Sequence, residues 1–284
     1  MFERICSYKM PDKSFGYVHS KDTPPRQQDF ILHNHSEYEI LIFLKGNAEF
    51  IVEGNVYELS PMDIIITRPD EMHYILLTNS KVYERIVFHI DASFFENVEY
   101  KKYLEIFLNR KSGEGNLIKK ETAKSAEVFD TIVRLENYMR EEEKDNSLVI
   151  RCVMTELLHQ LNNMKFSDGR VQNQTVKNVI NYINEHLGED LSLDLLANEF
   201  FVSKHHLCRS FKICTGFTVN RYITYRRIML TKELHRNGKS LSEASSEAGF
   251  SDYSNFYRAY VKETGYSPTA GMGGTNMKSM LDKI

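Results

Sequence analysis

Three residues that can bind a metal ion or a polar ligand stand close together near the amino terminus. They are His33, His35 and Glu39, and a further histidine, His73, follows them. Imidazole nitrogens and a carboxylate can ligate iron, manganese, zinc or nickel. The same groups can also hydrogen-bond to a small organic molecule inside an apolar pocket. His33, His35 and Glu39 have the same parity along an extended strand, so we expect their side chains to face one interior.

The stretch from residue 29 to residue 90, which must position these side chains, has the pattern of a small all-β domain. Runs of β-branched and aromatic residues alternate with Gly/Asn turns such as Gly46-Asn47. Short, evenly spaced strands of this kind favour a sandwich or a small barrel. The expected strands are Glu39–Leu44, Ala48–Val52, Val56–Leu59, Asp63–Thr67, His73–Leu77 and Tyr83–Ile90.

The spacing His33-x-His35-x-x-x-Glu39, with His73 later, resembles the cupin motifs. The resemblance implies a jelly-roll barrel in which two histidines, a glutamate and a third histidine converge. The second motif is one residue shorter than the metal-binding pattern and lacks its glycine, and Gln27 stands where the first motif normally begins with glycine. We therefore expect no metal, and keep His33, His35, Glu39 and His73 as the alternative set of metal ligands.

A pocket for a small organic effector is the expected use of this barrel. Such a pocket needs a few polar groups on an apolar wall. The residues before Asp29, which include Pro24-Pro25, are expected to fold over it as an arm. The candidate effector-binding residues are Arg26, His33, His35, Glu39, His73, Tyr83 and Arg85.

The last third of the chain contains one internal repeat. Residues 193–217 and 241–266 match at apolar positions, and the second copy has one inserted residue. A repeat present only twice cannot form a solenoid, which needs three or more units. A short helix, a tight turn and a longer helix in each copy instead predict two helix-turn-helix units.

Capping residues set the expected helix ends in both copies. Ser192 and Ser203 can cap the two helices of the first copy. In the second copy we expect Ser240 and Ser251 to cap the helices, and Gly249 to supply a positive φ in the turn. Gly216 and Gly265 are expected to end the two longer helices.

The longer helix of each copy carries side chains suited to DNA. Each copy keeps one arginine in register, and an arginine can take a guanine edge in the major groove. Either face alone could equally be a solvated surface, but the duplication favours DNA. The candidate DNA-binding residues are Lys204, His205, His206, Cys208, Arg209, Lys212, Tyr253, Ser254, Asn255 and Arg258.

Between the copies, residues 218–236 are long enough for one continuous helix. That helix would hold the two units so that their reading helices enter successive major grooves, about 34 Å apart. Residues 171–284 contain 14 lysine and arginine residues and 11 aspartate and glutamate residues, which gives a net charge of +3. Residues 1–170 carry a net charge of −6. This modest split indicates docking with few phosphate contacts rather than general nucleic-acid binding.

These motifs together resemble the AraC/XylS transcription regulators. The resemblance covers about 80 residues in two stretches, 191–234 and 240–268, and includes the runs Ala248–Asp252 and Thr264–Pro268. It implies that bases are read by His205, Cys208 and Arg209 in the first unit and by Tyr253, Ser254 and Arg258 in the second. The chain departs from the family at Ala244-Ser245, which would loosen the second unit's core. It departs again at Gly271 and Met272 after the last motif.

A helical segment joins the two halves. Residues 120–140 and 147–164 each carry an apolar stripe at helical spacing, the second through Val149, Cys152, Val153, Leu157 and Leu161. The stripes can simply pack on the barrel, and the family resemblance implies a dimer interface. The expected domains are 1–118 for the effector domain, 119–164 for the helical segment, 165–175 for the linker, 176–270 for the DNA-binding domain and 271–284 for the tail.

Composition limits the remaining choices. The 284 residues suit two domains, and the four scattered cysteines form no CxxC pair. The first residues lack an apolar signal segment, and no apolar run approaches the roughly 20 residues of a membrane span. We expect a reduced, cytoplasmic protein that does not enter the membrane.

The expected fold is α+β with two domains: a cupin-like β-barrel (jelly roll) with a helical hairpin, then an all-α domain with two helix-turn-helix units joined by a long helix. The expected function is a sequence-specific DNA-binding transcription regulator that a small-molecule effector controls, and not an enzyme. Activation is taken as its expected effect on genes, with repression as the alternative. Its expected partners are double-stranded DNA, a small-molecule effector for which the resemblance suggests a sugar, a second copy of the chain, and RNA polymerase as a further candidate. One alternative is a metal-dependent cupin enzyme fused to a DNA-binding module. The other is a constitutive DNA-binding protein whose barrel only dimerises.

Overall fold

The computed structural model describes residues 2–30, 33, 35–69, 71–78, 81–95, 102–121, 125–140 and 145–269. The chain divides into two compact units, Met1–Arg170 and Val171–Ile284. The expected tail, 271–284, lies outside the described residues.

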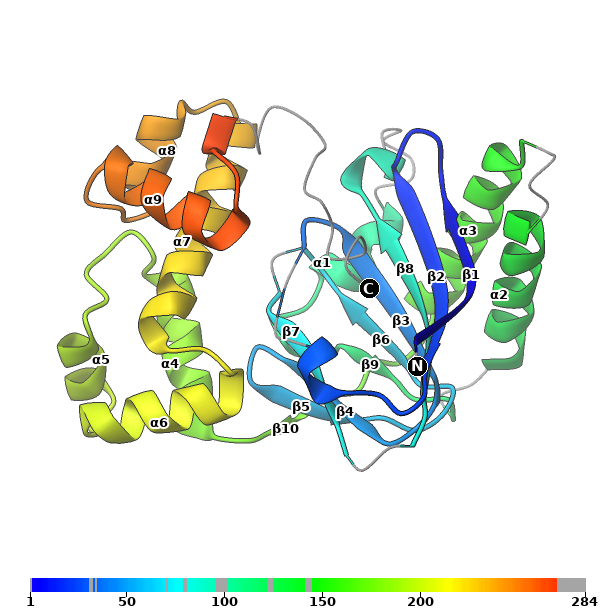
Figure 1. Ribbon diagram of the computed structural model, residues 1–284, viewed down its shortest axis with the longest axis horizontal. Helices are drawn as coiled ribbons and strands as arrows, with labels where there is room; N and C mark the ends of the chain where they lie inside the picture. Colours follow the sequence, from blue (N-terminus) through cyan, green and yellow to red (C-terminus); the bar gives the residue numbers. More distant parts are fainter. Residues whose placement is uncertain are drawn as a thin grey trace. The chain divides into compact units, whose positions relative to one another are not determined.

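The first unit is built on two antiparallel sheets (Figure 1). The larger sheet has the strand order β1-β2-β8-β3-β6-β9, and in the smaller sheet β4 pairs with β5 and with β7. A two-residue strand, β10 (Arg170–Val171), marks the boundary of the unit. The other strands are β1 (Phe2–Lys9), β2 (Phe15–Asp22), β3 (Tyr38–Lys45), β4 (Ala48–Val52), β5 (Asn55–Glu58), β6 (Ile64–Thr67), β7 (His73–Leu77), β8 (Tyr83–Ile90) and β9 (Leu117–Ile118).

Alternation along the strands produces two apolar cores. On β3, Leu41 and Phe43 belong to a cluster that also contains Phe50 of the smaller sheet, so this cluster fills the barrel interior. Their neighbours Ile40 and Ile42 point to the opposite face and join a second cluster with residues of the helices. The larger sheet is therefore covered on both faces, which explains the nearly continuous apolar sequence of β3.

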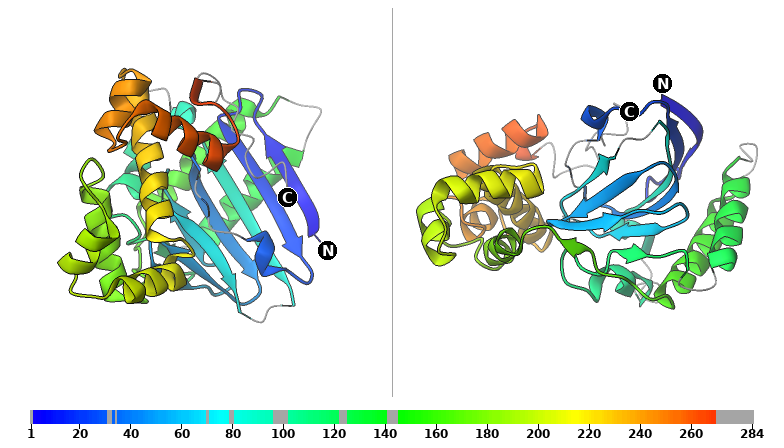
Figure 2. Two further views of the ribbon diagram at one scale, coloured as in Figure 1. Left: turned by 60° about the vertical axis from the view of Figure 1, so that its left-hand side comes forward. Right: turned by 90° about the horizontal axis from the view of Figure 1, so that it is seen from below.

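Two helices, α2 (Ser125–Arg140) and α3 (Ser147–Asn162), cover the outer face of the larger sheet (Figure 2). The buried residues of α3 include Val153, Leu157 and Leu161, as its stripe predicts. Val149 and Cys152 were expected in the same stripe but are exposed. The stripe turns instead through Ile150 and Met154, because buried neighbours on a helix stand three or four residues apart.

The expectation of an amino-terminal arm is wrong for residues 2–22. The segment forms a hairpin of β1 and β2, and β2 pairs with β8 along its whole length. The unit also contains the short 3-10 helices η1 (Gln27–Asp29) and η2 (Ala92–Phe95) and the four-residue α1 (Glu105–Leu108). The hairpin thus extends the larger sheet rather than folding over the pocket as an arm.

The second unit is all-α and contains the expected duplication. The first copy is α5 (Leu193–Glu199) and α6 (Lys204–Thr215), the second is α8 (Leu241–Glu247) and α9 (Tyr253–Thr264), and α4 (Gln174–Glu185) precedes them. The helix α7 (Val219–Arg236) is continuous and joins the two copies (Figure 2). These findings confirm the predicted two-domain α+β fold. Among the described residues no helix is both long and apolar enough to cross a membrane.

The turns of the two copies differ in a way that the repeat alone did not indicate. Gly249 has φ +94, as expected, and a Cβ there would lie 2.2 Å from the carbonyl oxygen of Leu187. The matched position in the first copy is Phe201, which also has a left-handed backbone, with φ +52, and whose side chain is 96% exposed. A phenylalanine with this φ is strained, because its Cβ approaches the following carbonyl.

Candidate functional sites in the barrel and on the reading helices

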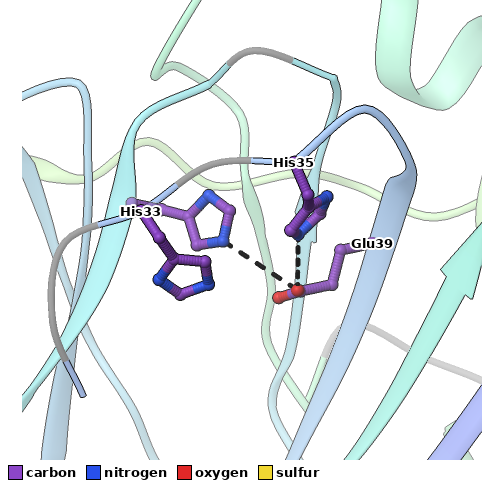
Figure 3. Close-up of side chains that lie close together, drawn as sticks. His33, His35 and Glu39 are labelled. Carbon is purple, nitrogen blue, oxygen red and sulfur yellow. Dashed lines mark hydrogen bonds and ion pairs between the residues drawn. The ribbon is translucent and has the colours of Figure 1, made fainter. Parts of the chain in front are cut away.

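The four predicted histidine and glutamate side chains converge inside the barrel. Glu39 comes from β3 in the larger sheet and His73 from β7 in the smaller one. His33 and His73 form an isolated bridge through mutual backbone hydrogen bonds of 3.0 and 2.9 Å. Figure 3 shows His33, His35 and Glu39 pointing toward one another. The four ligand atoms all lie within 4.8 Å of one another.

The route to this convergence differs from the predicted one. We expected His33, His35 and Glu39 on one extended strand, but β3 begins only at Tyr38. His33 and His35 instead belong to the segment that leads into the strand. Shared parity therefore gave the right neighbours for the wrong reason, because the bridge to His73 positions His33.

A hydrogen-bonded ion pair lies at the centre of this cluster. His35 Nε2 is 2.9 Å from Glu39 Oε2, and its Nδ1 is 2.9 Å from the carbonyl oxygen of Glu37. Both ring nitrogens face acceptors, so both must carry protons if both are to donate. Burial lowers the pKa of His35, but the hydrogen bond to Glu39 and the charge of that carboxylate outweigh it and raise the pKa. Burial likewise opposes the charge of Glu39, yet the hydrogen bond from His35 and the neighbouring imidazoles hold its pKa well below the usual range.

His73 is the most deeply buried histidine of the cluster. Its exposed fraction is 2%, and its Nδ1 lies 2.8 Å from the carbonyl oxygen of Glu71, to which it donates. Burial and the neighbouring His33 lower the pKa of His73 to about 3, so this imidazole is neutral near pH 7. Its Nε2 has no hydrogen-bond partner and lies 3.9 Å from Glu39 Oε2.

A further histidine, which was not among the predicted residues, belongs to this site. His89 pairs with Glu39 across β8 and β3, and its Nδ1 lies 4.0 Å from Glu39 Oε2. Burial and the neighbouring His35 lower its pKa to about 4. The signal was present in the sequence, because His89 has the same parity on the strand as Tyr83 and Arg85.

Tyr83 and Arg85 form a second polar group on the same face of β8. Arg85 donates to Asp22 over 3.0 Å, and its guanidinium lies 4.7 Å from the ring centroid of Tyr83 and 5.0 Å from that of Phe30. Burial raises the pKa of Tyr83, whose hydroxyl has no hydrogen-bond partner. Asp22 is another residue that the sequence did not indicate. Arg26 lies apart, exposed and paired with Asp29 at 3.0 Å, so the structure brings together all the predicted effector residues except this one.

On α6 the predicted DNA-binding side chains form an exposed face. Lys204, His205, His206, Arg209 and Lys212 are exposed, Cys208 is half-buried, and Leu207 and Phe211 pack into the core. The hydroxyl of Ser203 accepts from the backbone N–H of His206, as the capping prediction requires. Within the described part of the chain, Arg209 has neither a hydrogen-bond nor an ion-pair partner.

The predicted residues of α9 are exposed or half-exposed but differently arranged. Asn255 receives a hydrogen bond from Arg258, and its amide donates to Ser251 over 2.6 Å and to Asp252 over 2.8 Å. The expected cap Ser251 is wrong: the carboxylate of Asp252 caps the helix by accepting from the backbone N–H of Asn255. An acidic group is also favoured there by the helix dipole.

The core of the second helix-turn-helix unit is well packed at the positions where we expected it to be loose. Ala244 and Ser245 are both buried, and the hydroxyl of Ser245 donates to the carbonyl oxygen of Ser242 over 3.0 Å. Small residues let α8 approach its neighbours closely, and that hydrogen bond satisfies the buried hydroxyl. The substitution therefore leaves no unpaired polar group.

Comparison with known proteins agrees with this division into two sites. A family model described as the AraC-like ligand binding domain matches residues 21–158, and a helix-turn-helix domain model matches residues 196–271. The chain belongs to the AraC family of transcription regulators. Among its relatives, the transcriptional activator RhaS of Escherichia coli is 24% identical over 85% of this chain and 87% of its own length. The regulator YfiF of Bacillus subtilis is 24% identical over 90% of this chain and 83% of its own.

The solved structures similar to this AraC-family chain include ToxT from Vibrio cholerae, bound to (E)-4-(8-methylnaphthalen-1-yl)but-3-enoic acid. It is 15% identical, covers 92% of this chain and 99% of its own, and has a TM-score of 0.38. The family models place the ligand-binding domain on the barrel and the helix-turn-helix domain on the tandem unit. The protein is thus a DNA-binding transcription regulator with a ligand-binding domain, as the sequence predicted.

Proposed function

We propose that a small polar organic effector, with a carbohydrate as the favoured class, binds inside the barrel and changes the affinity of the second unit for its operator. The observation that carries this proposal is the convergence of polar side chains from both sheets on an otherwise apolar interior. Tyr83 contributes a hydroxyl and His73 a ring nitrogen that lack hydrogen-bond partners there. Aromatic rings lie beside both groups. The ring centroid of Phe30 is 5.1 Å from that of Tyr83, and the ring centroid of Phe50 is 5.6 Å from that of His73. Aromatic rings beside unsatisfied polar atoms suit a polyhydroxylated ligand.

Control of DNA binding requires that the effector bind one arrangement of the regulator better than another. A ligand with equal affinity for both would shift nothing, however tightly it bound. We infer that DNA is read by the exposed faces of α6 and α9, with Arg209 and Arg258 on base edges and Lys212 on phosphate. Their exposure supports this assignment.

We propose a homodimer through α2 and α3, supported by the exposed apolar side chains Val133 and Leu148 on these helices. We further propose an activator that contacts RNA polymerase, works in the cytoplasm and catalyses no reaction. Leu148→Lys should then shift the protein from dimer to monomer in sedimentation, whereas Lys165→Glu in the following segment should not.

The central test measures operator affinity with and without ligands. Operator DNA is selected from random sequence with the purified full chain, and its dissociation constant is then measured in the presence of individual sugars. We expect at least one sugar to change the affinity by tenfold or more, about 1.4 kcal/mol. Phe30→Ala should abolish that response and leave ligand-free DNA binding unchanged, while Phe2→Ala, on β1, should respond normally. An affinity that no small molecule alters would instead favour the constitutive DNA-binding protein.

A further inference from the structure

We infer that Glu71 couples the ligand-binding interior of the barrel to the segment 165–170, with which the chain leaves the first unit. The carbonyl oxygen of Glu71 holds His73, its carboxylate holds the loop 109–116, and that loop holds the segment. The inference rests on the proposed function, and it adds the part of the regulation that lies within the first unit. Both ends of the connection belong to one compact unit, so the fold of the barrel alone fixes its contacts.

The backbone of Glu71 is tied to the imidazole of His73. Glu71 is almost completely buried, with an exposed fraction of 1%, and its carbonyl oxygen accepts from His73 Nδ1 over 2.8 Å. The other nitrogen of this ring, Nε2, has no hydrogen-bond partner and lies 3.9 Å from the carboxylate of Glu39. A ligand that bonds to Nε2 and turns the ring therefore also acts on the backbone at Glu71.

The carboxylate of Glu71 holds the loop 109–116 at three residues. Arg110 donates to both carboxylate oxygens, over 2.7 and 2.6 Å, and the backbone N–H of Gly113 donates over 2.8 Å. The side-chain amide of Asn116 donates to the same carboxylate over 3.2 Å. A buried carboxylate needs such charge-assisted hydrogen bonds in place of water. A shift of Glu71 therefore displaces the loop rather than leaving a buried charge unpaired.

Tyr57, on β5 of the smaller sheet, contacts both the loop 109–116 and the segment 165–170. Its hydroxyl donates to the carbonyl oxygen of Gly113 over 2.6 Å and lies 3.0 Å from Oδ1 of Asn116. Its ring lies directly against Gly169, where a Cβ would be only 2.9 Å from the Cζ atom of the tyrosine. The position of the loop and the path of the segment thus depend on the same buried side chain.

Hydrogen bonds from the end of the loop attach the segment 165–170 to the barrel. The backbone N–H of Gly115 donates to the exposed carboxylate of Asp168 over 2.9 Å, and the N–H of Ser167 donates to the carbonyl oxygen of Leu117 over 2.7 Å. Coupling requires an element with two arrangements that both ends influence. Partly exposed bonds of this kind open locally. The docked and the released segment are therefore the two arrangements whose populations a ligand would shift.

The test changes the barrel end of the connection and measures the segment, so it needs no ligand. Hydrogen exchange of the peptide that contains residues 165–170 is followed by mass spectrometry on the full chain. His73→Phe removes the donor to Glu71 and should speed exchange of this peptide about tenfold, because the released segment becomes more populated. Tyr17→Phe removes another buried hydroxyl, on β2, and should leave the exchange unchanged. Thermal unfolding verifies that each variant folds, and His73→Leu replaces His73→Phe if the larger ring prevents folding.

A double variant separates coupling from a local loss of packing. Tyr57→Phe removes the hydroxyl that holds Gly113 and should also speed exchange of the peptide about tenfold. The bonds of His73 and Tyr57 act on one segment through one loop, so the double variant should exchange about as fast as either single variant. Independent sites would instead multiply to about 100-fold. Unchanged exchange in the His73 variant, or a multiplied effect in the double variant, would overturn the inference.

Operator binding distinguishes a failure of this inference from a failure of the proposed function. Where a sugar changes the operator affinity of the wild-type chain, Tyr57→Phe should lose most of that change and Tyr17→Phe should keep it. A full response in Tyr57→Phe would refute the coupling and leave the proposed function intact. If no small molecule alters the affinity of the wild-type chain, the proposed function fails, and hydrogen exchange still decides whether Glu71 connects the two ends.

Discussion

Individual residues account for the main difference between the two helix-turn-helix units. Phe201 and Gly249 occupy matched turn positions with left-handed backbones, but only glycine adopts this conformation without strain. Phe201→Gly should therefore stabilise the all-α unit that contains both copies. The free energy of unfolding should rise by up to about 1 kcal/mol, after the extra freedom of glycine in the unfolded chain is subtracted. Gly249→Ala should destabilise it by about 2 kcal/mol or more, because its Cβ would collide with the carbonyl oxygen of Leu187. Urea unfolding of both variants measures the two changes, and equal effects would contradict this account.

Arg209 and Arg258, the two arginines that we propose to contact bases, should differ in their dependence on a neighbouring side chain. Arg209→Ala and Arg258→Ala should each cost about 1–3 kcal/mol of binding at one operator base pair, whereas Lys212→Ala should weaken all sequences alike. Asn255 holds Arg258 by a hydrogen bond, while Arg209 has no such support among the described residues. Asn255→Ala should therefore lower specificity at the base pair assigned to Arg258 and leave that of Arg209 unchanged. Binding measured on an operator and on its single-base variants decides the assignment; losses equal on operator and random DNA would refute it.

At the scale of elements, two strands bury histidines that must stay neutral. The pKa of His73 on β7 falls to about 3 and that of His89 on β8 to about 4, from an ordinary value near 6.5. Between these values the unfolded chain binds more protons than the folded one, so stability rises with pH in this window. Acidification from about pH 6.5 toward pH 4 should thus cost up to about 1.4 kcal/mol per pH unit for each histidine.

Urea unfolding of the full chain in chelator, followed by circular dichroism between pH 7 and pH 5, measures this loss. His89→Gln should flatten the pH dependence, while His159→Gln, at an exposed position of α3, should leave it unchanged. Identical slopes for all three proteins would show that these buried histidines do not determine it.

How far the elements could be predicted depended on whether the signal was local. Strands β4, β7 and β8 begin and end where the alternation and turn residues indicate, and the caps Ser192, Ser203 and Ser240 are as expected. The hairpin of β1 and β2 was missed because β1 is mostly exposed at the sheet edge, so it lacks an apolar pattern. Its pairing with β8 joins residues far apart in the sequence, which no local periodicity reveals.

Prediction of the site residues likewise depended on whether their signal was local in the sequence. His33, His35, Glu39 and His73 were found from motif spacing. Parity along the strand could have placed His89 on the inner face of β8, but only its cross-strand pairing with Glu39 brings it to the cluster. Asp22 was missed because its role comes from its contact with Arg85. Arg26 was placed by proximity in sequence alone, and it lies apart from the cluster. Spacing along the chain therefore identified the ligand-like residues but not their neighbours across the sheet.

At the scale of the whole molecule, the helix α7 fixes the phase between the two reading helices. Its 18 residues correspond to about 27 Å at 1.5 Å per residue. One alanine inserted near its middle would turn the second helix-turn-helix unit by about 100° relative to the first helix-turn-helix unit. Such a variant should lose operator binding while both helix-turn-helix units still fold, as measured by gel shift and circular dichroism. The conservative substitution Lys232→Arg in the same helix should bind normally.

A continuous α7 also limits how this regulator can acquire new target genes. One base pair added between the two subsites would rotate one around the duplex by about 34°, since a turn holds 10–10.5 base pairs. The helix cannot follow that rotation without breaking its backbone hydrogen bonds. New operators should therefore arise in a genome by base substitution within a fixed frame, and promoters that differ by small insertions in that frame should fall outside the regulon.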